Sequence, residues 1–502
     1  MSVWPVLGAS LASLCAGLLA FGVWLWASRQ RTSAPGPPTL PLLGNVLHFY
    51  KQPVLLDRFR ELHKRYGDVF RLYLGPKLAI AVMQPEDLKQ VLITSKEHQR
   101  DPYILRSVPF LIGNGLITNN KETWKRHRKL LEPAFHFEAL EKYMDTFNEE
   151  GHLLCQNLMA TGGAEVDVYP IMSLSAMRII LSTIGGLEMD RLEPDPSKQV
   201  ELVAIIFKGL KTAAKLIFQP WKAFHCALWM SPEGREVRRV NKICRNFTEK
   251  YLNCLRDDVT SIKAKERTYL SGLYSEVHSE KIATEDFMRD EAATIAVSGT
   301  ESTAGALSYA LALLGLYPEW QEMAQRQLDQ VFGGGGDFLR PVTKADLSQL
   351  TVIDAILKET LRLFPPAPII PRLVSEDIPL AGGRYVAPRG CCVFLAFFLT
   401  HRHPELFPDP DKFDPGRFLP GGSAASRRSC SYLPFSTGPR GCVGGPYATM
   451  EIKTLLATLL RRLRIIPGSS REELETVLLS ITSHPLTGYR VSCIPREIQS
   501  FK

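Results

Sequence analysis

The pattern of apolar and polar positions begins with a long apolar stretch. Val6 to Ala27 form an apolar run of about 22 residues, roughly 33 Å long as a helix, which is enough to span a bilayer. Arg29 and Arg31 follow directly and are expected to stay on the cytosolic side. A cleaved signal peptide is disfavoured because no basic segment precedes the run. The pattern therefore predicts one N-terminal transmembrane helix, a signal anchor over residues 1–28.

The next stretch, 29–45, is rich in proline and has no helical period, so it predicts a stiff extended tether. No linker or block of like charges divides the rest of the chain. Residues 46–502 are therefore expected to form one large catalytic domain, although a length of 502 residues alone would suggest about three domains.

Alternating apolar residues predict strands near the start of this domain. Val69–Leu74 and Leu78–Met83 flank a Gly-Pro-Lys turn and predict a hairpin. Helical patterns lie on either side, near Leu55–Tyr66 and Pro85–Ile93.

From about Thr123 to Leu363 the patterns are mainly helical. Short strand-like pieces recur around Pro368–Val386, and Pro485–Cys493 suggests a final hairpin. The chain is therefore predicted to be mainly α, with a small β portion at both ends of the catalytic domain. The glycine run Gly333–Gly336 is predicted to be a surface loop, because it lacks the strand and lysine of a phosphate-binding loop.

Composition and charge narrow the class of protein. With 45% hydrophobic and 22% charged residues, the chain is an ordinary globular protein in composition. A formal charge of +8 is mild for this length; it fits an anionic membrane surface or an acidic protein partner, and no nucleic-acid-binding module is found. The ten cysteines include no C-x-x-C pair, which argues against a disulfide framework or structural zinc and favours the reducing cytosol.

Cys442 alone among the cysteines stands in a glycine-rich frame, Phe435–Gly444. Arg440 offers positive charge to a thiolate or a grip on a cofactor carboxylate. Glycines such as Gly438 let the backbone approach a large flat group, and backbone N–H groups can donate to the sulfur. A long helix is predicted from 448 to 463, with its positive N-terminus close to the thiolate.

Two pairs of side chains stand on single helix faces. Glu359 and Arg362 lie at i and i+3, and Trp124 and Arg128 lie at i and i+4. Alone, either pair is unremarkable, since exposed ion pairs contribute little and a tryptophan is often part of a core. A third helix, Ala293–Gly305, is apolar and rich in small residues, and the alternative for it is an ordinary buried helix with satisfied hydroxyls.

The sequence F-x-x-G-x-R-x-C-x-G at residues 435–444 resembles the heme-binding loop of cytochromes P-450. The other motifs follow in the order of that family, and the resemblance covers nearly the whole chain: Trp124/Arg128, Gly299–Thr303, Glu359/Arg362, Arg417 and Cys442. It implies the cytochrome P-450 fold and heme b, with Cys442 as the axial thiolate ligand of the iron. It also implies that Glu359, Arg362 and Arg417 form a buried Glu-Arg-Arg triad.

The resemblance implies roles for the remaining polar residues. Trp124, Arg128, Arg372 and Arg440 are expected to hold the heme propionates, with Phe435 and Gly438 in the heme-binding loop. Glu301 and Ser302 are expected to relay protons during oxygen activation, with Thr303 in support. Ser302 stands where the family has threonine; because serine is less constrained at χ1, coupling could be leakier.

The implied activity is a membrane monooxygenase that inserts one oxygen atom from O2 into a lipophilic substrate, such as a fatty acid, terpenoid, sterol or xenobiotic. The chain has no dinucleotide fingerprint, so electrons are expected from a separate NADPH-dependent flavoprotein reductase, with cytochrome b5 as a further candidate donor. Two alternatives stay open: a thiolate-heme isomerase or dehydratase that acts on a peroxide without a reductase, and a heme-binding or sensing protein without catalysis.

Two sequence segments, Trp124–Phe137 and Arg372–Asp377, are most similar to the family-four clan of microsomal enzymes. This resemblance implies that the protein is located in the endoplasmic reticulum membrane, with its catalytic domain in the cytosol. Many members carry a glutamate that esterifies the heme. Ser298 stands at that position here and cannot form the ester, which puts attack at the terminal carbon in doubt.

Three further surfaces are predicted. Lys121, Lys125 and Lys129 follow one helix stripe that, with Arg427 and Arg428, is a candidate docking site for an acidic electron donor. A solvated face is equally compatible with the stripe.

Val203–Met230 predicts basic amphipathic helices, either resting on a bilayer or packed as a helix pair with their lysines in water. Val108–Ile117 is a candidate distal wall of the site.

Overall fold

The computed structural model describes most of the chain. The main described stretches, with a few single residues between them, are 20–24, 26–49, 55–95, 99–217, 230–261, 284–333, 337–480 and 482–497.

The described strands are short. They are β1 (Val69–Leu74), β2 (Lys77–Val82), β3 (Val166–Asp167), β4 (Ile370–Leu373), β5 (Ile378–Leu380), β6 (Tyr385–Ala387), β7 (Cys392–Leu395), β8 (Leu463–Pro467), β9 (Val477–Leu479), β10 (Ser483–Pro485) and β11 (Arg490–Pro495).

The described helices form most of the molecule. They are α2 (Leu55–Tyr66), α3 (Pro85–Lys89), α4 (Pro109–Ile112), α5 (Lys121–Leu131), α6 (Phe137–Lys142), α7 (Met144–Met159), α8 (Tyr169–Ile180), α9 (Met189–Leu192), α10 (Pro196–Ile217), α12 (Pro232–Ser261), α14 (Glu285–Leu316), α15 (Pro318–Phe332), α16 (Lys344–Gln349), α17 (Thr351–Leu363), α18 (Phe397–Thr400), α19 (Gly445–Arg462) and α20 (Arg471–Glu475).

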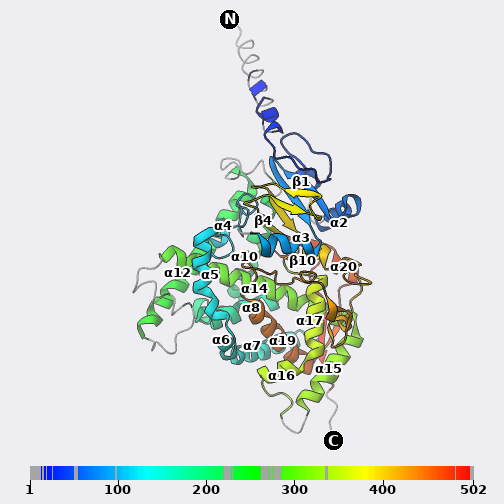
Figure 1. The fold of residues 1–502 in the computed structure, drawn as a ribbon. Coiled ribbons are helices and arrows are strands. Elements are labelled where there is room, and N and C mark those ends of the chain that lie inside the picture. The colour runs from blue at the N-terminus through cyan, green and yellow to red at the C-terminus, as the bar shows by residue number, and fades with distance from the viewer. Residues whose placement is uncertain are drawn as a thin grey trace.

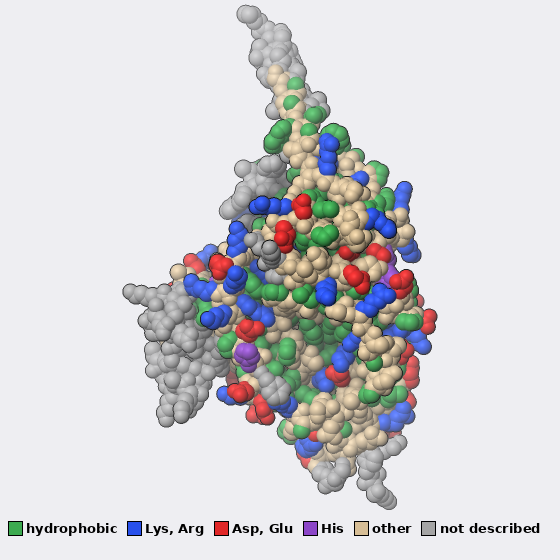
Figure 2. Space-filling model, in the orientation of Figure 1, with side chains coloured by type: hydrophobic (Ala, Val, Ile, Leu, Met, Phe, Trp, Pro, Cys, Tyr) green, Lys and Arg blue, Asp and Glu red, His purple; other side chains and the backbone are tan. Residues whose placement is uncertain are grey.

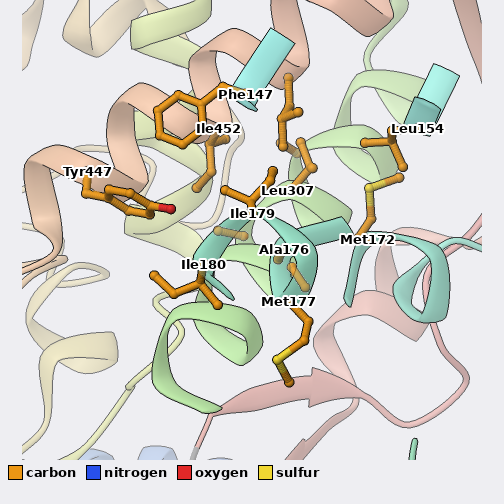
Figure 3. Close-up of a cluster of buried hydrophobic side chains, with 14 of the residues drawn as sticks. Phe147, Leu154, Met172, Ala176, Met177, Ile179, Ile180, Leu307, Tyr447 and Ile452 are labelled. Atoms are coloured by element: carbon orange, nitrogen blue, oxygen red, sulfur yellow. The ribbon is translucent and has the colours of Figure 1, made fainter. Parts of the chain in front are cut away.

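Helix α14 crosses the middle of the helical body (Figure 1). Thr284 caps its first turn by accepting a hydrogen bond from the N–H of Phe287, and the helix then continues for 32 residues, about 48 Å. Most of its side chains are buried, because α8, α12, α17 and α19 pack around it. Figure 3 shows part of this core, where Ile179 and Ile180 of α8, Leu307 of α14 and Ile452 of α19 lie together.

The larger sheet lies at the N-terminal end of the helical body, with strand order β1-β2-β7-β4 (Figure 1). The predicted hairpin is confirmed, since Leu74 pairs with Lys77 across a two-residue turn. Strand β2 places Ile80 and Val82 in one apolar cluster and Ala79 and Ala81 in another, so the sheet has a core on each face.

Most of the other sequence-based elements are also confirmed. The helix at Leu55–Tyr66 has the predicted bounds, and the middle of the chain is helical. Strands β4 to β6 lie around Pro368–Val386, as predicted, with β6 ending one residue later. The helix after the cysteine loop begins at Gly445, three residues earlier than predicted.

The final hairpin predicted within Pro485–Cys493 is wrong. Strand β10 pairs with β9, whereas β11 pairs with β8 and β3. The chain turns between them at Gly488, where φ is +81° and an added Cβ would lie 2.4 Å from a carboxylate oxygen of Asp167. The two strands therefore leave the turn toward different sheets.

The predicted anchor over 1–28 falls largely outside the described residues. Within the stretches that are described, no helix is both long and apolar enough to cross a membrane. The tether is held to the catalytic domain at Gln30, whose backbone carbonyl accepts a hydrogen bond from the Tyr73 hydroxyl at 2.7 Å, and at Arg29, which lies over the Tyr73 ring.

A buried ion pair ties α17 to the segment that leads to the cysteine loop. Glu359 and Arg362 are both fully buried and are joined by two hydrogen bonds of 2.8 Å. Arg362 also donates to the carbonyl groups of His401, Pro410 and Lys412. Because these carbonyls belong to an irregular segment, the guanidinium supplies donors that secondary structure would otherwise provide.

Arg417 completes the predicted triad, with its Nε 3.4 Å from a Glu359 oxygen. Its Nη2 donates to the carbonyl of Asp409 at 2.9 Å, and Glu359 accepts from the N–H of Asp414 at 2.8 Å. The triad therefore binds backbone groups on both sides of the 409–417 segment.

We predict that Arg362→Met lowers the free energy of unfolding by about 3–5 kcal/mol, because it leaves Glu359 as a buried charge that has lost its bidentate partner. Urea unfolding followed by circular dichroism measures the change. The control is Arg58→Met, since the pair of Arg58 with Glu61 is exposed and its loss should change stability by less than about 0.5 kcal/mol. Equal effects of the two substitutions would refute the argument.

Candidate functional site

A mostly apolar cavity of about 400 Å³ lies between α14 and the loop that precedes α19. Ser298, Ser302 and Ala306 face it from α14, and Phe435 and Cys442 face it from the loop. The segment 108–117, predicted to be a distal wall, lies at the cavity. Four of its apolar residues line the cavity: Val108, Ile112, Leu116 and Ile117.

The cysteine loop is closed by its own backbone. The N–H of Cys442 donates to the carbonyl of Phe435 at 2.9 Å, and the N–H of Gly441 donates to that of Gly438 at 2.9 Å. The Cys442 side chain lies deep in the protein but is exposed to the cavity. The sulfur is therefore open on one side only, the side on which a ligand would lie.

Burial among protein atoms raises the pKa of the Cys442 thiol. The N–H groups of Gly444 and Gly445, at the start of α19, and the positive charges of Arg128 and Arg100 lower it without offsetting the burial. Direct coordination of a metal cation deprotonates a thiol outright. The site thus suits a sulfur that is a metal ligand better than one that is a free nucleophile.

Gly438 does not line the cavity. Its φ of +73° and the carbonyl of Leu92, which an added Cβ would approach to 2.1 Å, account for the glycine. Close packing of the loop on this carbonyl explains the residue, and its part in cofactor binding stays a prediction.

Three arginine guanidinium groups gather beside the cysteine loop. Burial lowers the pKa of Arg100 to about 10. Burial and then the charge of Arg100 lower that of Arg440 to about 9. The pKa of Arg372 is lowered well below its usual value by burial and by both neighbours. The cluster therefore concentrates buried positive charge beside the cysteine loop.

Several N–H groups in this cluster have no protein acceptor within the described stretches. They are Nε and Nη2 of Arg372 and Nε of Arg100. Arg440 donates to the carbonyl of Asn119 at 2.8 Å and to the side chain of Asn120 at 2.9 Å. Buried donors are normally paired, so those of Arg372 and Arg100 indicate a ligand with acceptor oxygens.

Two of the residues expected to hold the heme propionates, Trp124 and Arg128, lie on α5 and line the cavity. Trp124 lies with its ring 4.0 Å from the guanidinium carbon of Arg440 and lines the cavity. Arg128 also lines the cavity, but its Nη1 donates to the carbonyl of Gly441 at 2.8 Å. Arg128 thus ties α5 to the cysteine loop.

These residues fit heme. A large flat group in the cavity would meet Cys442 on one side, α14 on the other, and Arg100 and Arg440 among the lining residues. Arg372 does not itself line the cavity. The two propionates of heme would supply acceptor oxygens for the unpaired donors of Arg100 and Arg372.

The opposite wall carries the predicted proton-relay residues, all of which line the cavity. The Ser302 hydroxyl donates to the carbonyl of Ser298 at 2.9 Å, and the Ser298 hydroxyl in turn donates to the carbonyl of Thr294 at 2.6 Å. The Thr303 hydroxyl is buried and has no partner among the described residues. These hydroxyls offer acceptor oxygens beside the ligand position.

Glu301 turns toward the β9–β10 hairpin. One carboxylate oxygen, Oε1, accepts a hydrogen bond from the Ser480 hydroxyl at 2.8 Å and lies 3.4 Å from Nε2 of His484. Glu301 is 3% exposed, so its charge is sheltered from bulk water.

The sequence analysis missed Arg100, Ser480 and His484. Arg100 stands in an irregular segment, where a charged residue is normally in solvent, and no period marks it. The hairpin residues lie about 180 positions after Glu301, as the sequence separations of 179 and 183 show. The only available signal was the presence of polar residues within a strand-like segment.

Comparison with known proteins agrees with this geometry. Residues 34–489 match the family described as Cytochrome P450. The chain belongs to that family, and its cofactor is heme b with an axial cysteine thiolate. It is a cytochrome P450 monooxygenase, an oxidoreductase.

Its relatives place it among family-four members. It is 32% identical to Cytochrome P450 4V2 of Mus musculus over 86% of this chain and 84% of the relative. It is 33% identical to Cytochrome P450 4V2 of Homo sapiens, with the same coverage of both chains. It is 30% identical to Cytochrome P450 4c3 of Drosophila melanogaster over 92% of this chain and 89% of the relative.

We predict that Arg100→Leu speeds the loss of heme about tenfold, because one charge-assisted contact to a propionate disappears. Transfer of heme to an excess of a heme-scavenging apoprotein measures the rate. Arg384→Leu is the control, since Arg384 is exposed and does not line the cavity. A wild-type rate for Arg100→Leu would remove Arg100 from the heme site.

Proposed function

We propose that this cytochrome P450 is anchored in the endoplasmic reticulum membrane with its catalytic domain in the cytosol. It oxidises a lipophilic substrate with electrons from NADPH, delivered by a separate flavoprotein reductase. In each turnover the substrate C–H, O2, NADPH and one proton give the alcohol, water and NADP⁺. Cytochrome b5 is a further candidate electron donor.

One observation carries this proposal: the Cys442 sulfur opens into a largely apolar cavity whose far wall bears Glu301, Ser302 and Thr303. Heme, when bound, supplies the centre at which O2 is reduced. The apolar walls select a lipophilic substrate and keep bulk water out.

The chain's own residues then act as follows. The Ser302 hydroxyl donates a hydrogen bond toward the cavity only after leaving the Ser298 carbonyl, so it can switch between two acceptors. Glu301 holds and releases a proton at its carboxylate, from a position that bulk water does not reach. The Ser298 hydroxyl donates to the Thr294 carbonyl of its own helix, so this position offers no carboxylate that could form an ester with heme.

Reconstitution with a reductase, NADPH and a panel of fatty acids, terpenoids, sterols and xenobiotics tests the proposal. An oxygenated product that requires both NADPH and the reductase supports it. Turnover of a peroxide substrate without NADPH would favour the isomerase or dehydratase instead, and the absence of substrate-dependent NADPH consumption would favour a heme-binding protein without catalysis.

We predict that Ser302→Ala lowers the product formed per NADPH consumed by about threefold or more, because a hydroxyl is lost from the proton path. Ser308→Ala is the matched control: Ser308 lies on the same helix and is fully buried, but it does not line the cavity. Product and NADPH are measured in the same reaction. Unchanged coupling would exclude Ser302 from the mechanism.

The docking proposal rests on the lysine stripe of α5. Lys121, Lys125 and Lys129 are exposed, as are Arg427 and Arg428. The bond from Arg128 to the Gly441 carbonyl puts this stripe beside the cysteine loop. On the face in Figure 2, basic and acidic side chains are interspersed.

We predict that Lys125→Glu with Lys129→Glu raises the apparent KM for the reductase about tenfold at low salt, because like charges now meet at the interface. The difference should shrink at about 0.5 M salt, where charges are screened. Lys198→Glu, a reversal on exposed α10 surface, is the control. Reduction kinetics identical to wild type at low salt would refute the docking site.

A further inference from the structure

Behind the cavity wall, a chain of buried polar side chains joins α14 to the β9–β10 hairpin. Glu301, Ser480 and Thr482 line the cavity, whereas His484 and Tyr489 do not. All five side chains are buried. Nothing in the proton-relay proposal above uses the histidine or the tyrosine.

His484 contacts partners through both ring nitrogens. Its Nε2 lies 2.7 Å from the Thr482 hydroxyl and 3.4 Å from Oε1 of Glu301. Its Nδ1 lies 2.9 Å from the Tyr489 hydroxyl. The imidazole thus stands between a tyrosine and a carboxylate.

These contacts fix which nitrogen carries the proton. An ionised carboxylate only accepts hydrogen bonds, so an Nε2 lone pair facing Glu301 would be repelled. Burial raises the pKa of Tyr489 well above its usual value, which keeps its hydroxyl protonated and able to donate to Nδ1. The arrangement therefore favours a proton on Nε2, with this N–H shared between Thr482 and Glu301.

The ring has little freedom to leave this position. It packs edge-on against Tyr169 of α8, with the ring centroids 4.7 Å apart. It also covers Gly305, one helical turn beyond Glu301, where an added Cβ would lie 3.4 Å from the imidazole. Ser483 holds the hairpin from below, donating to the carbonyl groups of Pro365 and Pro366.

We infer that His484 is a positioning residue: with Ser480, it fixes Oε1 of Glu301 against the hairpin and leaves Oε2 for the cavity. Among the described residues, Oε2 has no hydrogen-bond partner, and this oxygen is not fully buried. One oxygen is anchored, and the other is presented to the reaction. This inference rests on the proposed monooxygenase function for its effect on turnover, but not for the geometry itself.

Two substitutions of His484 separate the loss of its hydrogen bond to Glu301 from the loss of its ring packing. His484→Leu removes the donor to Glu301, whereas His484→Gln keeps an N–H group near the Nε2 position. We expect His484→Leu to lower product per NADPH about threefold and His484→Gln to restore most of it, with the KM for substrate unchanged. His152→Leu is the control, a partly buried histidine on α7 away from the cavity.

A double-mutant cycle tests whether His484 acts through Glu301. In a Glu301→Gln background, His484→Leu should cause little further loss of coupling, because the carboxylate that it positions is already gone. Full additivity of the two losses, or wild-type coupling in His484→Leu with an intact heme spectrum, would overturn the inference.

Nuclear magnetic resonance of ¹⁵N-histidine-labelled holoenzyme in its ferrous carbon monoxide form provides a readout that needs no turnover. His484 should show the neutral Nε2–H tautomer at pH 8, and Tyr489→Phe should shift the Nδ1 signal. An Nδ1–H tautomer in the wild type would overturn the geometry. If the wild type gives the expected signals but makes no NADPH-dependent product, the proposed function fails and the positioning of Glu301 stands.

Discussion

The buried positive charge beside the cysteine loop constrains the rest of this structure. Burial lowers the pKa values of Arg100, Arg372 and Arg440, and the charge of Arg100 lowers those of the other two further. Donors of Arg100 and Arg372 lack protein acceptors within the described stretches. Desolvating such groups costs several kcal/mol each unless anionic oxygens compensate. Bound heme would offset this cost on two sides, because its propionates would face the arginines and its iron would face the Cys442 thiol, whose pKa burial raises.

Other contacts of the fold hold the arginine cluster and the cysteine loop in position relative to each other. The arginines come from three separate segments of the chain, and the sulfur comes from the loop that precedes α19. The Glu359–Arg362 pair fixes the 409–417 segment that leads into that loop, and Arg128 fixes the loop to α5. A buried ion pair is rarely the cheapest way to gain stability, but here it supplies directional donors to irregular backbone that an apolar core could not satisfy.

Sequence patterns predicted these features unequally, for physical reasons. The β1–β2 hairpin, α2 and α14 follow from local periods, because each buries one face or nearly all of its surface. The loop around Cys442 followed from the joint match of several fixed positions. Arg100 and the correct partners of β10 and β11 were not predictable in this way, because they depend on contacts between segments far apart in the chain and on a single turn at Gly488.

The Glu301 network shows why such distant contacts carry chemical detail. The residues around Glu301 on α14 predict a carboxylate at the cavity wall, yet they do not say which of its oxygens is available. That choice is made by Ser480 and His484, which bind Oε1 from a hairpin that α14 cannot specify locally. Serine at 302 is less constrained at χ1 than threonine, so in the proposed proton relay Glu301, held through Oε1, would be the more rigidly placed of the two residues.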